Sequence, residues 1–218
     1  MPDTAIVCCG GGSVHRCARA SLTPGALVIA ADSGLLLADE LGLRVDLLVG
    51  DMDSITTEQV AAAESGGARV ERHPAEKDAT DLELALDAAL IADVQRVLVL
   101  GGGGGRSDHH LANVALLSAP KFGALEIEAI LGNARFTVIH GGRGPRHICG
   151  APGSLVTLLP YGGWACGIRT AGLLYALDGE DLPPGTSRGV SNVFAADRAS
   201  VVLEEGTLLA VQPLEDPS

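Results

Sequence analysis

Five short, continuous apolar runs, separated by longer amphipathic segments, constrain the fold of the first 132 residues more than any other feature of this sequence. The runs are Ala5–Cys9, Ala26–Ala30, Leu47–Val49, Val97–Leu100 and Ile127–Leu131. Parallel strands covered on both faces have continuous apolar sequences, whereas strands with one solvent-exposed face alternate apolar and polar residues. We therefore predict that these runs are strands of a mostly parallel sheet.

The segments between the runs have the apolar spacing of helices. Helices are predicted over Gly34–Leu41, Thr57–Ser65, Thr80–Ala92 and Asp108–Ser118. In the third, Thr80 and Glu83 have the spacing of a capping box. Strands that alternate with helices imply a parallel sheet with right-handed crossovers. Residues 1–132 are thus expected to form an α/β domain.

The sequence pattern changes after Asn133. Short strand candidates follow, separated by turns rich in glycine and proline, and no segment has a clear helical pattern. The candidates are Arg135–His140, Ser154–Leu159, Gly167–Thr170, Ser200–Leu203 and Leu208–Gln212. We predict that residues 133–218 form an all-β, sandwich-like domain.

The charge balance excludes several classes of protein. The 218 residues contain 27 acidic and 15 basic side chains, a formal net charge of −12, which disfavours binding to nucleic acid or to anionic lipid. Aromatic residues make up only 3% of the chain, too few for a platform that stacks nucleobases. No apolar run approaches the ~20 residues that span a bilayer. If this chain binds a phosphorylated ligand, a divalent cation is expected to supply positive charge.

The cysteines indicate a reducing compartment. There are five of them, irregularly spaced and without a C-x-x-C motif, so we predict reduced thiols, no zinc site and a cytoplasmic protein. The N-terminal residues lack the basic segment of a signal peptide. The cysteines are Cys8, Cys9, Cys17, Cys149 and Cys166.

Acidic residues follow two of the predicted strands and begin one helix. Asp32 comes after the second run, Asp51 and Asp53 follow the third, and Asp81 lies at the start of the third helix. Ligands of open α/β sheets bind outside the carboxyl ends of the strands, so these side chains are expected to meet. Carboxylates are ligands that Mg²⁺ prefers, and we predict a magnesium–polyphosphate site here. A turn whose carboxylates cap backbone amides is the alternative for Asp51 and Asp53.

A glycine run, Gly101–Gly105, follows the fourth predicted strand and precedes Arg106. Its backbone amides can approach a phosphate, and a guanidinium binds phosphate through two hydrogen bonds. The run is neither a dinucleotide-binding fingerprint, because Arg106 replaces the third glycine, nor a P-loop, because no Lys-Ser/Thr follows. Lys77 is a second phosphate candidate or a solvated surface lysine, and Asp108 is either a helix N-cap or a ligand contact.

Taken in order, these motifs resemble the thiamine pyrophosphokinase family over nearly the whole chain. The likeness rests on six stretches: Ala31-Asp32-x-Gly34, Gly50-Asp51-x-Asp53-Ser54, Lys77-Asp78-x-Thr80-Asp81-Leu82-Glu83, Gly104-Gly105-Arg106-x-Asp108-His109, Thr170-x-Gly172-Leu173-x-Tyr175-x-Leu177 and Gly189-Val190-Ser191-Asn192. Several motifs in one order are more specific than any of them alone.

The resemblance implies a homodimeric enzyme with its substrate site at the subunit interface. Residues 1–132 would bind ATP, and residues 133–218 would contribute to thiamine binding and dimerisation. The enzyme would transfer pyrophosphate from ATP to the hydroxyethyl group of thiamine, giving thiamine diphosphate and AMP with Mg²⁺ as cofactor. The family pattern implies metal ligands at Asp32, Asp51, Asp53, Asp78 and Asp81; ATP contacts at Lys77, Gly101, Gly104, Gly105, Arg106 and Asp108; and thiamine contacts at Tyr175, Ser191 and Asn192. Among these, Asp32, Asp51, Asp53, Asp81 and Arg106 are the expected catalytic residues.

Two departures from the family pattern keep alternatives open. Leu36 and Val193 stand where the family usually has polar residues. A pyrophosphokinase or kinase for another small heterocyclic alcohol would share the acidic residues, and a non-catalytic homologue would bind thiamine or nucleotide without turnover. The intact set of carboxylates favours the enzyme.

Overall fold

The backbone divides into two compact units, each with its own buried core. The computed structural model describes residues 2–101, 103 and 106–215. The first unit comprises Met1–Leu116 and Ala124–Asn133, and the second comprises Leu117–Gly123 and Ala134–Ser218. Within the described part of the chain, every helix is too short or too polar to cross a membrane.

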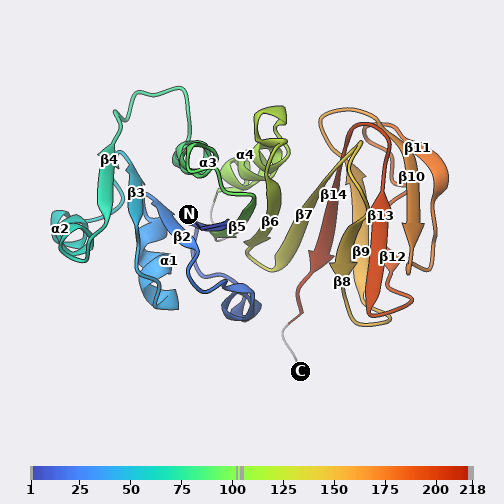
Figure 1. Cartoon of the computed structure of the whole chain (residues 1–218), viewed down its shortest axis with the longest axis horizontal. Helices are drawn as coiled ribbons and strands as arrows, with labels where there is room; N and C mark the ends of the chain where they lie inside the picture. Colours follow the sequence, from blue (N-terminus) through green and yellow to red (C-terminus); the bar gives the residue numbers. More distant parts are fainter. Residues whose placement is uncertain (1, 102, 104–105, 216–218) are drawn as a thin grey trace. The chain divides into compact units, whose positions relative to one another are not determined.

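The first unit contains six strands that lie side by side, and every neighbouring pair among them is parallel (Figure 1). The strand order is β6-β5-β1-β2-β3-β4. The strands are β1 (Thr4–Cys8), β2 (Leu27–Ala31), β3 (Leu47–Gly50), β4 (Arg69–Arg72), β5 (Arg96–Gly101) and β6 (Glu126–Leu131). The mostly parallel sheet predicted from the apolar runs is confirmed.

Strand β4 is the one strand of this sheet that the apolar runs do not predict. Its sequence, Arg-Val-Glu-Arg, is polar, and none of its four residues is fully buried. A strand at the edge of a sheet has only one neighbour, so it does not need the continuous apolar sequence of a central strand.

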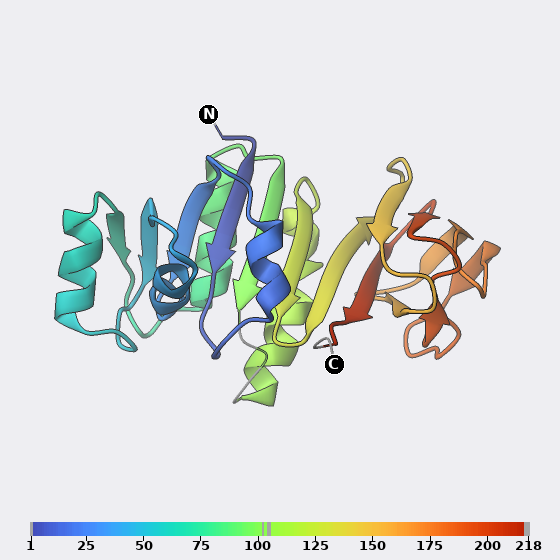
Figure 2. The same ribbon diagram turned by 90° about the horizontal axis from the view of Figure 1, so that it is seen from below.

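Helices cover both faces of the sheet. In Figure 1, α1 and η1 lie on one face and α3 and α4 on the opposite face, and Figure 2 shows the face with α1 and η1 from below. Helix α2 packs beside β4. The α-helices are α1 (Gly34–Leu41), α2 (Thr57–Ser65), α3 (Asp81–Ile91) and α4 (Ser107–Leu117), and the 3-10 helices are η1 (Arg16–Ser21) and η2 (Pro120–Phe122), the latter in the second unit.

Side-chain caps fix where two of these helices begin. At α2, the Gln59 N–H donates to the Thr56 hydroxyl and the Thr56 N–H donates to the Gln59 side chain, a complete capping box. At α3, the Thr80 hydroxyl accepts a hydrogen bond from the Glu83 N–H. Helix α3 therefore starts at Asp81, and this carboxylate lies in its first turn.

The strand order reverses between β1 and β5. From β1 the chain proceeds through β2 and β3 to β4 on one side, and β5 and β6 lie on the other. The loops that follow β1 and β5 therefore flank a topological switch point, where open α/β sheets bind their ligands.

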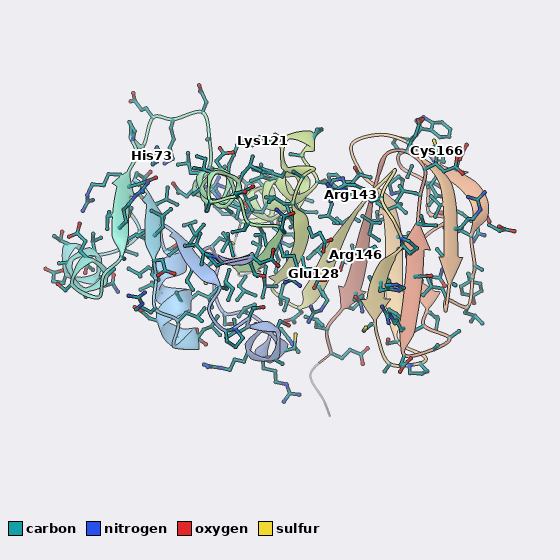
Figure 3. The ribbon with its side chains drawn as sticks, in the orientation of Figure 1. His73, Lys121, Glu128, Arg143, Arg146 and Cys166 are labelled. Carbon is teal, nitrogen blue, oxygen red and sulfur yellow. The ribbon has the colours of Figure 1, made fainter. Side chains whose placement is uncertain are left out.

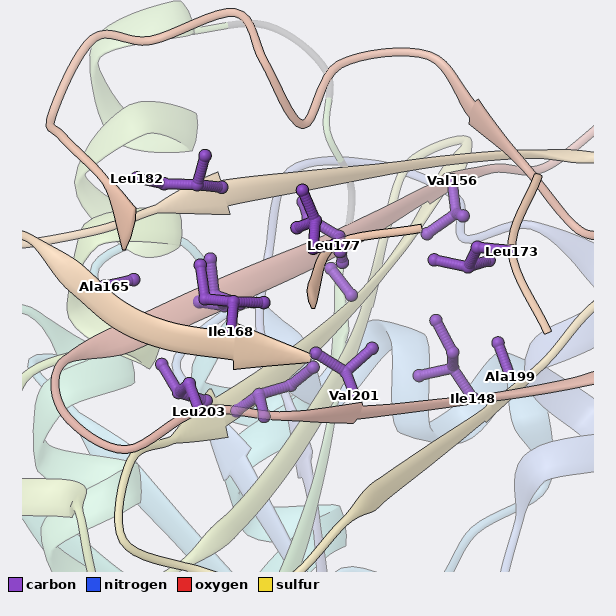
Figure 4. Close-up of a cluster of buried hydrophobic side chains, with 14 of the residues drawn as sticks. Ile148, Val156, Ala165, Ile168, Leu173, Leu177, Leu182, Ala199, Val201 and Leu203 are labelled. Atoms are coloured by element: carbon purple, nitrogen blue, oxygen red, sulfur yellow. The ribbon is translucent and has the colours of Figure 1, made fainter. Parts of the chain in front are cut away.

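The second unit consists of two antiparallel sheets that enclose one apolar core (Figure 4). Their strand orders are β12-β9-β14-β7 and β11-β10-β13-β8. The core contains side chains from both sheets, among them Val156, Leu158, Ile168 and Val201. The strands are β7 (Ala134–His140), β8 (Arg146–Cys149), β9 (Leu155–Pro160), β10 (Ala165–Ala171), β11 (Asp178–Leu182), β12 (Asn192–Val193), β13 (Arg198–Val202) and β14 (Thr207–Pro213).

This arrangement confirms the predicted sandwich-like, all-β part of the chain, with three strands more than the sequence pattern suggested. Strand β11 has the polar sequence Asp-Gly-Glu-Asp-Leu, and β12 has only two residues. Strand β8 has a single buried residue, Ile148. None of these has an apolar alternation long enough to predict a strand.

We predict that Gly34→Ala destabilises the first unit. A Cβ atom at Gly34 would lie 2.0 Å from the backbone oxygen of Cys8 in β1, and backbone cannot move aside as a flexible side chain can. The expected loss is about 1–3 kcal/mol of unfolding free energy, as for other overpacked sites, measured by urea denaturation followed by circular dichroism. Gly144→Ala is the control, because a Cβ atom there has no neighbour within 4 Å. Equal stability of the two variants would contradict the prediction.

Candidate active site

Three aspartates from two strand ends meet at the carboxyl edge of the parallel sheet. Asp32 follows β2, and Asp51 and Asp53 follow β3. One carboxylate oxygen from each lies within 4.8 Å of the others. Asp32 is buried, Asp51 is partly buried and Asp53 is exposed, so the group faces solvent on one side only. We call these three residues the acidic cluster.

The backbone around the acidic cluster adopts conformations that side chains disfavour. Asp32 has φ 46° and Met52 has φ 64°, both in the left-handed region. Such conformations cost of order 1 kcal/mol and persist where the surrounding structure enforces them, which is common at functional sites. Between them in the sequence, Gly50 has φ 144°, and a Cβ atom there would lie 3.0 Å from Asp81 Oδ1 and 3.1 Å from Asp32 Cβ. Glycine at this position therefore allows Asp32 and Asp81 to approach the end of β3.

Strand β4 supports the same edge. His73 directly follows β4 and is labelled in Figure 3. Its backbone N–H donates to the carbonyl of Gly50 at 2.8 Å, which extends the pairing of β3 and β4 by one residue. The end of β3 is thus held in place immediately before the two aspartates that it carries.

The loop after β3 also forms the turn that was the alternative interpretation of its sequence. The Asp53 N–H donates to Asp51 Oδ1 at 3.2 Å, and the Ser54 hydroxyl donates to Asp53 Oδ1 at 2.8 Å. These contacts set the orientation of the carboxylates without separating them. Turn capping and clustering occur together here.

Lys77 connects the acidic cluster to the first turn of α3. Its Nζ lies 3.2 Å from Asp51 Oδ2 and 3.0 Å from Asp81 Oδ1, and the side chain is only 14% exposed. The lysine that was a candidate for phosphate binding or for a solvated surface position is therefore inside a carboxylate network. Asp78, three residues before Asp81, is exposed and lies outside the cluster of three.

The pKa shifts follow from these contacts. The backbone N–H of Asp53 is the main cause of the lowered pKa of Asp51, against the effect of partial burial and with a further contribution from Lys77. Burial raises the pKa of Asp81, and the charges of Asp51 and Asp32 add to this while Lys77 opposes it. Partial burial disfavours the charged form of Lys77, but hydrogen bonds and charge attraction from Asp81 and Asp51 together raise its pKa.

The acidic cluster fits a divalent cation. Asp32 is 6% exposed, and its Oδ1 is buried without a hydrogen-bond partner. A buried carboxylate oxygen with no partner is costly, and a metal ion would satisfy it. The donor atoms are all carboxylate oxygens, the type that Mg²⁺ prefers. Asp32, Asp51 and Asp53 would hold the ion, with Asp81 adjacent.

Glycine loops lie beside the topological switch point. A Cβ atom at Gly101, the last residue of β5, would lie 2.3 Å from Cys9 Sγ after β1. One at Gly103 would lie 3.2 Å from the backbone of Gly132 after β6. Glycine at these positions thus allows the Cys9 side chain to pack against the end of β5, and the backbone at Gly103 to pack against the backbone at Gly132. The other two predicted ATP contacts in this run, Gly104 and Gly105, lie outside the described residues.

Arg106 and Asp108 form an exposed ion pair. The Arg106 guanidinium donates from Nη2 to Asp108 Oδ2 at 2.7 Å and from Nε to Oδ1 at 3.3 Å. This guanidinium holds the pKa of Asp108 at about 2. Asp108 lies in the first turn of α4, so the pair places a cation where β5 passes into that helix. A phosphate bound by Arg106 would compete with Asp108 for the same N–H groups.

Of the three predicted thiamine contacts, Asn192 has a clear role within the fold. Its side chain is buried, and its Oδ1 accepts from the N–H of Tyr175 at 3.0 Å and from that of Val193 at 2.8 Å. Its Nδ2 donates to the carbonyl of Tyr175 at 2.8 Å. Asn192 therefore fixes the backbone of the loop that carries Tyr175.

Tyr175 and its neighbours form an exposed apolar surface in the second unit. The side chains of Leu174, Tyr175 and Val190 are 60%, 54% and 46% exposed. Ser191, next to Val190, has φ 57°, and its N–H donates to the Thr157 hydroxyl at 3.1 Å. Hydrogen bonds between Asn192 and the Tyr175 backbone hold the segment of Leu174 and Tyr175 to the segment of Val190 and Ser191, so we call these residues the exposed apolar surface.

Comparison with known proteins assigns this architecture to one family. Residues 19–129, about half of the chain, match the family model "Thiamin pyrophosphokinase, catalytic domain". Residues 147–208 match "Thiamin pyrophosphokinase, vitamin B1 binding domain". The chain belongs to the thiamin pyrophosphokinase family. The resemblance inferred from the ordered motifs is confirmed.

Individual relatives agree with this assignment. Thiamine pyrophosphokinase of Bacillus subtilis (strain 168) is 38% identical over 91 residues, and the aligned segment spans 42% of this chain and 42% of that relative. The crystal structure of thiamine pyrophosphokinase from Bacillus subtilis has the same fold, with a TM-score of 0.83 at 23% identity over 98% of this chain and all of that chain. The crystal structure of thiamin pyrophosphokinase from Geobacillus thermodenitrificans matches with a TM-score of 0.79, at 26% identity over 99% of each chain.

The structure also shows site features that motif reading did not predict. Gly50 was noted only as part of a motif, yet its positive φ and its lack of a Cβ atom allow Asp81 to reach the acidic cluster. Gly10 lies so close to Ser33 that a Cβ atom would be 2.2 Å from the Ser33 hydroxyl. The sequence signal for both was a glycine immediately after a predicted buried strand.

We predict that Asp32→Asn removes the stabilisation of the protein by magnesium. A ligand that binds only the folded state adds about 2.7 kcal/mol at 100 times its dissociation constant. In calorimetric scans, the wild type should unfold at a higher temperature with Mg²⁺ than with EDTA, whereas the variant should show no such difference. In EDTA the variant should be at least as stable as the wild type, because it lacks a buried charge whose oxygen has no partner.

Asp39→Asn is the matched control, because it removes an exposed carboxylate from α1. This control should retain the increase in unfolding temperature that magnesium causes in the wild type. The same increase in Asp32→Asn, or a marked loss of stability of that variant in EDTA, would contradict the assignment of Asp32.

Proposed function

We propose that this protein transfers the pyrophosphoryl group of ATP to the hydroxyethyl oxygen of thiamine, in a Mg²⁺-dependent reaction that yields thiamine diphosphate and AMP. The observation that carries the proposal is the convergence of Asp32, Asp51 and Asp53 within 4.8 Å at the ligand-binding edge of the sheet. Membership of the thiamin pyrophosphokinase family supplies the substrates.

The acidic cluster would hold the metal against the phosphates of ATP. Bound Mg²⁺ would neutralise phosphate charge and orient the phosphoryl group. Asp32 contributes a buried oxygen without a partner, and Asp51 and Asp53 contribute oxygens oriented by the turn. Asp81, in the first turn of α3, and Asp78, in the segment before that helix, are the further acidic residues that the family pattern assigns to this site.

The phosphates and the nucleoside of ATP would lie along the switch point between β1 and β5. Gly101 ends β5, where a backbone without a side chain can approach a phosphate, and Arg106 supplies a guanidinium at the start of α4. Gly104 and Gly105 are the further glycines that the family pattern assigns to ATP. Asp108 holds Arg106 through two hydrogen bonds until the nucleotide arrives. Arg106 would then stabilise charge on the phosphoryl oxygens.

The chemical step needs positioning more than covalent assistance. The hydroxyl oxygen of thiamine attacks the β-phosphorus of ATP and forms the new P–O bond. The bond between the β-phosphorus and the oxygen that bridges it to the α-phosphate breaks, and AMP leaves. The hydroxyl proton is released. The residues must place the hydroxyl group of thiamine against the anionic polyphosphate of ATP, and they must exclude water because water would compete as the nucleophile.

Thiamine would contact the exposed apolar surface around Tyr175 and Ser191, in a homodimer whose partner copy completes the site. Asn192 would act by holding the Tyr175 backbone in place. Leu36 and Val193, the two departures from the family pattern, are accommodated in the fold, since Leu36 is exposed on α1 and Val193 pairs with Leu155 in β12 and β9. A cytoplasmic location agrees with the five free thiols and with ATP as donor.

Incubation of the purified protein with thiamine and Mg-ATP should yield AMP and thiamine diphosphate in equal amounts, identified by mass spectrometry. Asp53→Asn should reduce AMP formation by at least 100-fold while leaving circular dichroism unchanged, because the exposed Asp53 contributes charge at the site and no core packing. Asp39→Asn is the control. ADP as product, turnover of a different alcohol only, or full activity of Asp53→Asn would refute the proposal.

The homodimer is tested by light scattering, which should give twice the chain mass of 22.2 kDa. Val190→Asp should shift the protein toward the monomer and raise the KM for thiamine, because it places a charge on the exposed apolar surface. Leu111→Asp is the control on another exposed apolar side chain, on α4. A monomeric wild type at assay concentration would exclude a shared site.

A further inference from the structure

Lys77 is an internal cation within the proposed metal site. Its ammonium contacts Asp51 Oδ2 at 3.2 Å and Asp81 Oδ1 at 3.0 Å. The three side chains are 14%, 16% and 28% exposed, so solvent weakens these ion pairs much less than it would on an open surface. Lys77 thus supplies positive charge to a group of acids that would otherwise repel one another.

Both oxygens of Asp51 are already occupied by hydrogen bonds. Oδ1 accepts from the backbone N–H of Asp53, and Oδ2 accepts from Lys77. The backbone N–H is fixed by the turn, whereas the ammonium is at the end of a flexible side chain. A metal ion that uses Asp51 would therefore displace Lys77 more easily than the backbone donor.

The position of Lys77 in the chain permits this displacement. It lies in the irregular segment between β4 and α3, four residues before Asp81. A partly buried ammonium that leaves two carboxylates is costly unless another anion takes it up. In the proposed reaction that anion is the polyphosphate of ATP, which would arrive at the same edge of the sheet.

We propose that Lys77 makes the binding of metal and nucleotide interdependent: it occupies the carboxylates in the free protein and transfers to the phosphates when the metal enters. The inference rests on the proposed function, since it assumes a metal–polyphosphate site. Free divalent metal then binds weakly, because it must displace the ammonium from Asp51 and leave it with Asp81 alone. Metal that arrives with the nucleotide binds tightly, because phosphate oxygens replace the contact that Lys77 loses at Asp51.

The test compares Mn²⁺ affinities by electron paramagnetic resonance, with and without a non-hydrolysable ATP analogue that has a methylene group between the α- and β-phosphates. Lys77→Met should bind Mn²⁺ on the order of tenfold more tightly than the wild type in the absence of nucleotide, as expected when a cation in contact with the ligands is removed. The analogue should then increase Mn²⁺ affinity by a smaller factor in Lys77→Met than in the wild type.

Two further variants define what the charge of Lys77 does. Lys77→Arg keeps a cation and should retain the weak affinity of the wild type for free Mn²⁺. Lys121→Met removes the chain's other lysine, which lies in η2 and is labelled in Figure 3, and should behave as the wild type. In EDTA, Lys77→Met should unfold at a lower temperature than Lys121→Met. Mn²⁺ should abolish this difference, because the metal replaces the missing positive charge.

The outcomes separate this inference from the proposed function. If the wild type binds Mn²⁺ with the analogue but folded Lys77→Met binds free Mn²⁺ no more tightly, the inference is overturned and the metal site stands. A smaller effect of the analogue without tighter binding of free Mn²⁺ would make Lys77 a phosphate contact only, which also overturns it. If wild type, Lys77→Met and Lys121→Met all fail to bind Mn²⁺ with or without the analogue, the proposed metal site itself fails.

Discussion

Mutual repulsion between carboxylates at one edge of a parallel sheet is the constraint on which the first unit depends. Asp32, Asp51 and Asp53 approach within 4.8 Å, and Asp81 lies next to them across Gly50. A fold that brings such groups together must supply positive charge, because charged groups out of water are stable only when paired. In the free protein that charge comes from Lys77, which contacts Asp51 and Asp81.

The backbone accepts strain so that the carboxylates can meet. Met52 and Asp32 both have backbone angles in the left-handed region. This conformation is unfavourable for Met52, whereas the short polar side chain of Asp32 tolerates it better. Glycines at Gly34 and Gly50 let a helix and a second carboxylate approach strands more closely than any other residue would allow. The site is therefore built by close backbone approach as much as by side chains.

Sequence reasoning predicted those parts of the structure that depend on local patterns. The five buried strands of the parallel sheet and all four α-helices follow from apolar periodicity, and the position of Asp32, Asp51 and Asp53 follows from the rule that parallel strands end at one edge. The polar strand β4 could not be predicted in this way, because an edge strand needs no apolar run.

Side-chain partners were less predictable than positions. Lys77 was expected either to bind phosphate or to face solvent, and its contacts with Asp51 and Asp81 in the free protein depend on rotamers and burial that no spacing encodes. Asn192 was expected to contact a ligand. In the structure its side-chain amide accepts from the N–H of Tyr175 and donates to the carbonyl of Tyr175, as the backbone of a neighbouring strand would. The family resemblance indicates which residues matter at such positions, and the geometry indicates how they act.

The polar sequence of β4 has a consequence for assembly. Strand β4 is the last strand of the parallel sheet and carries Arg69, Glu71 and Arg72, with Arg69 and Glu71 forming an ion pair. An unprotected edge strand invites pairing with another polypeptide, and charged side chains discourage it. Two copies aligned along β4 would have to strip water from four arginine guanidinium groups. Growth of the sheet into a fibre from this side is thereby suppressed.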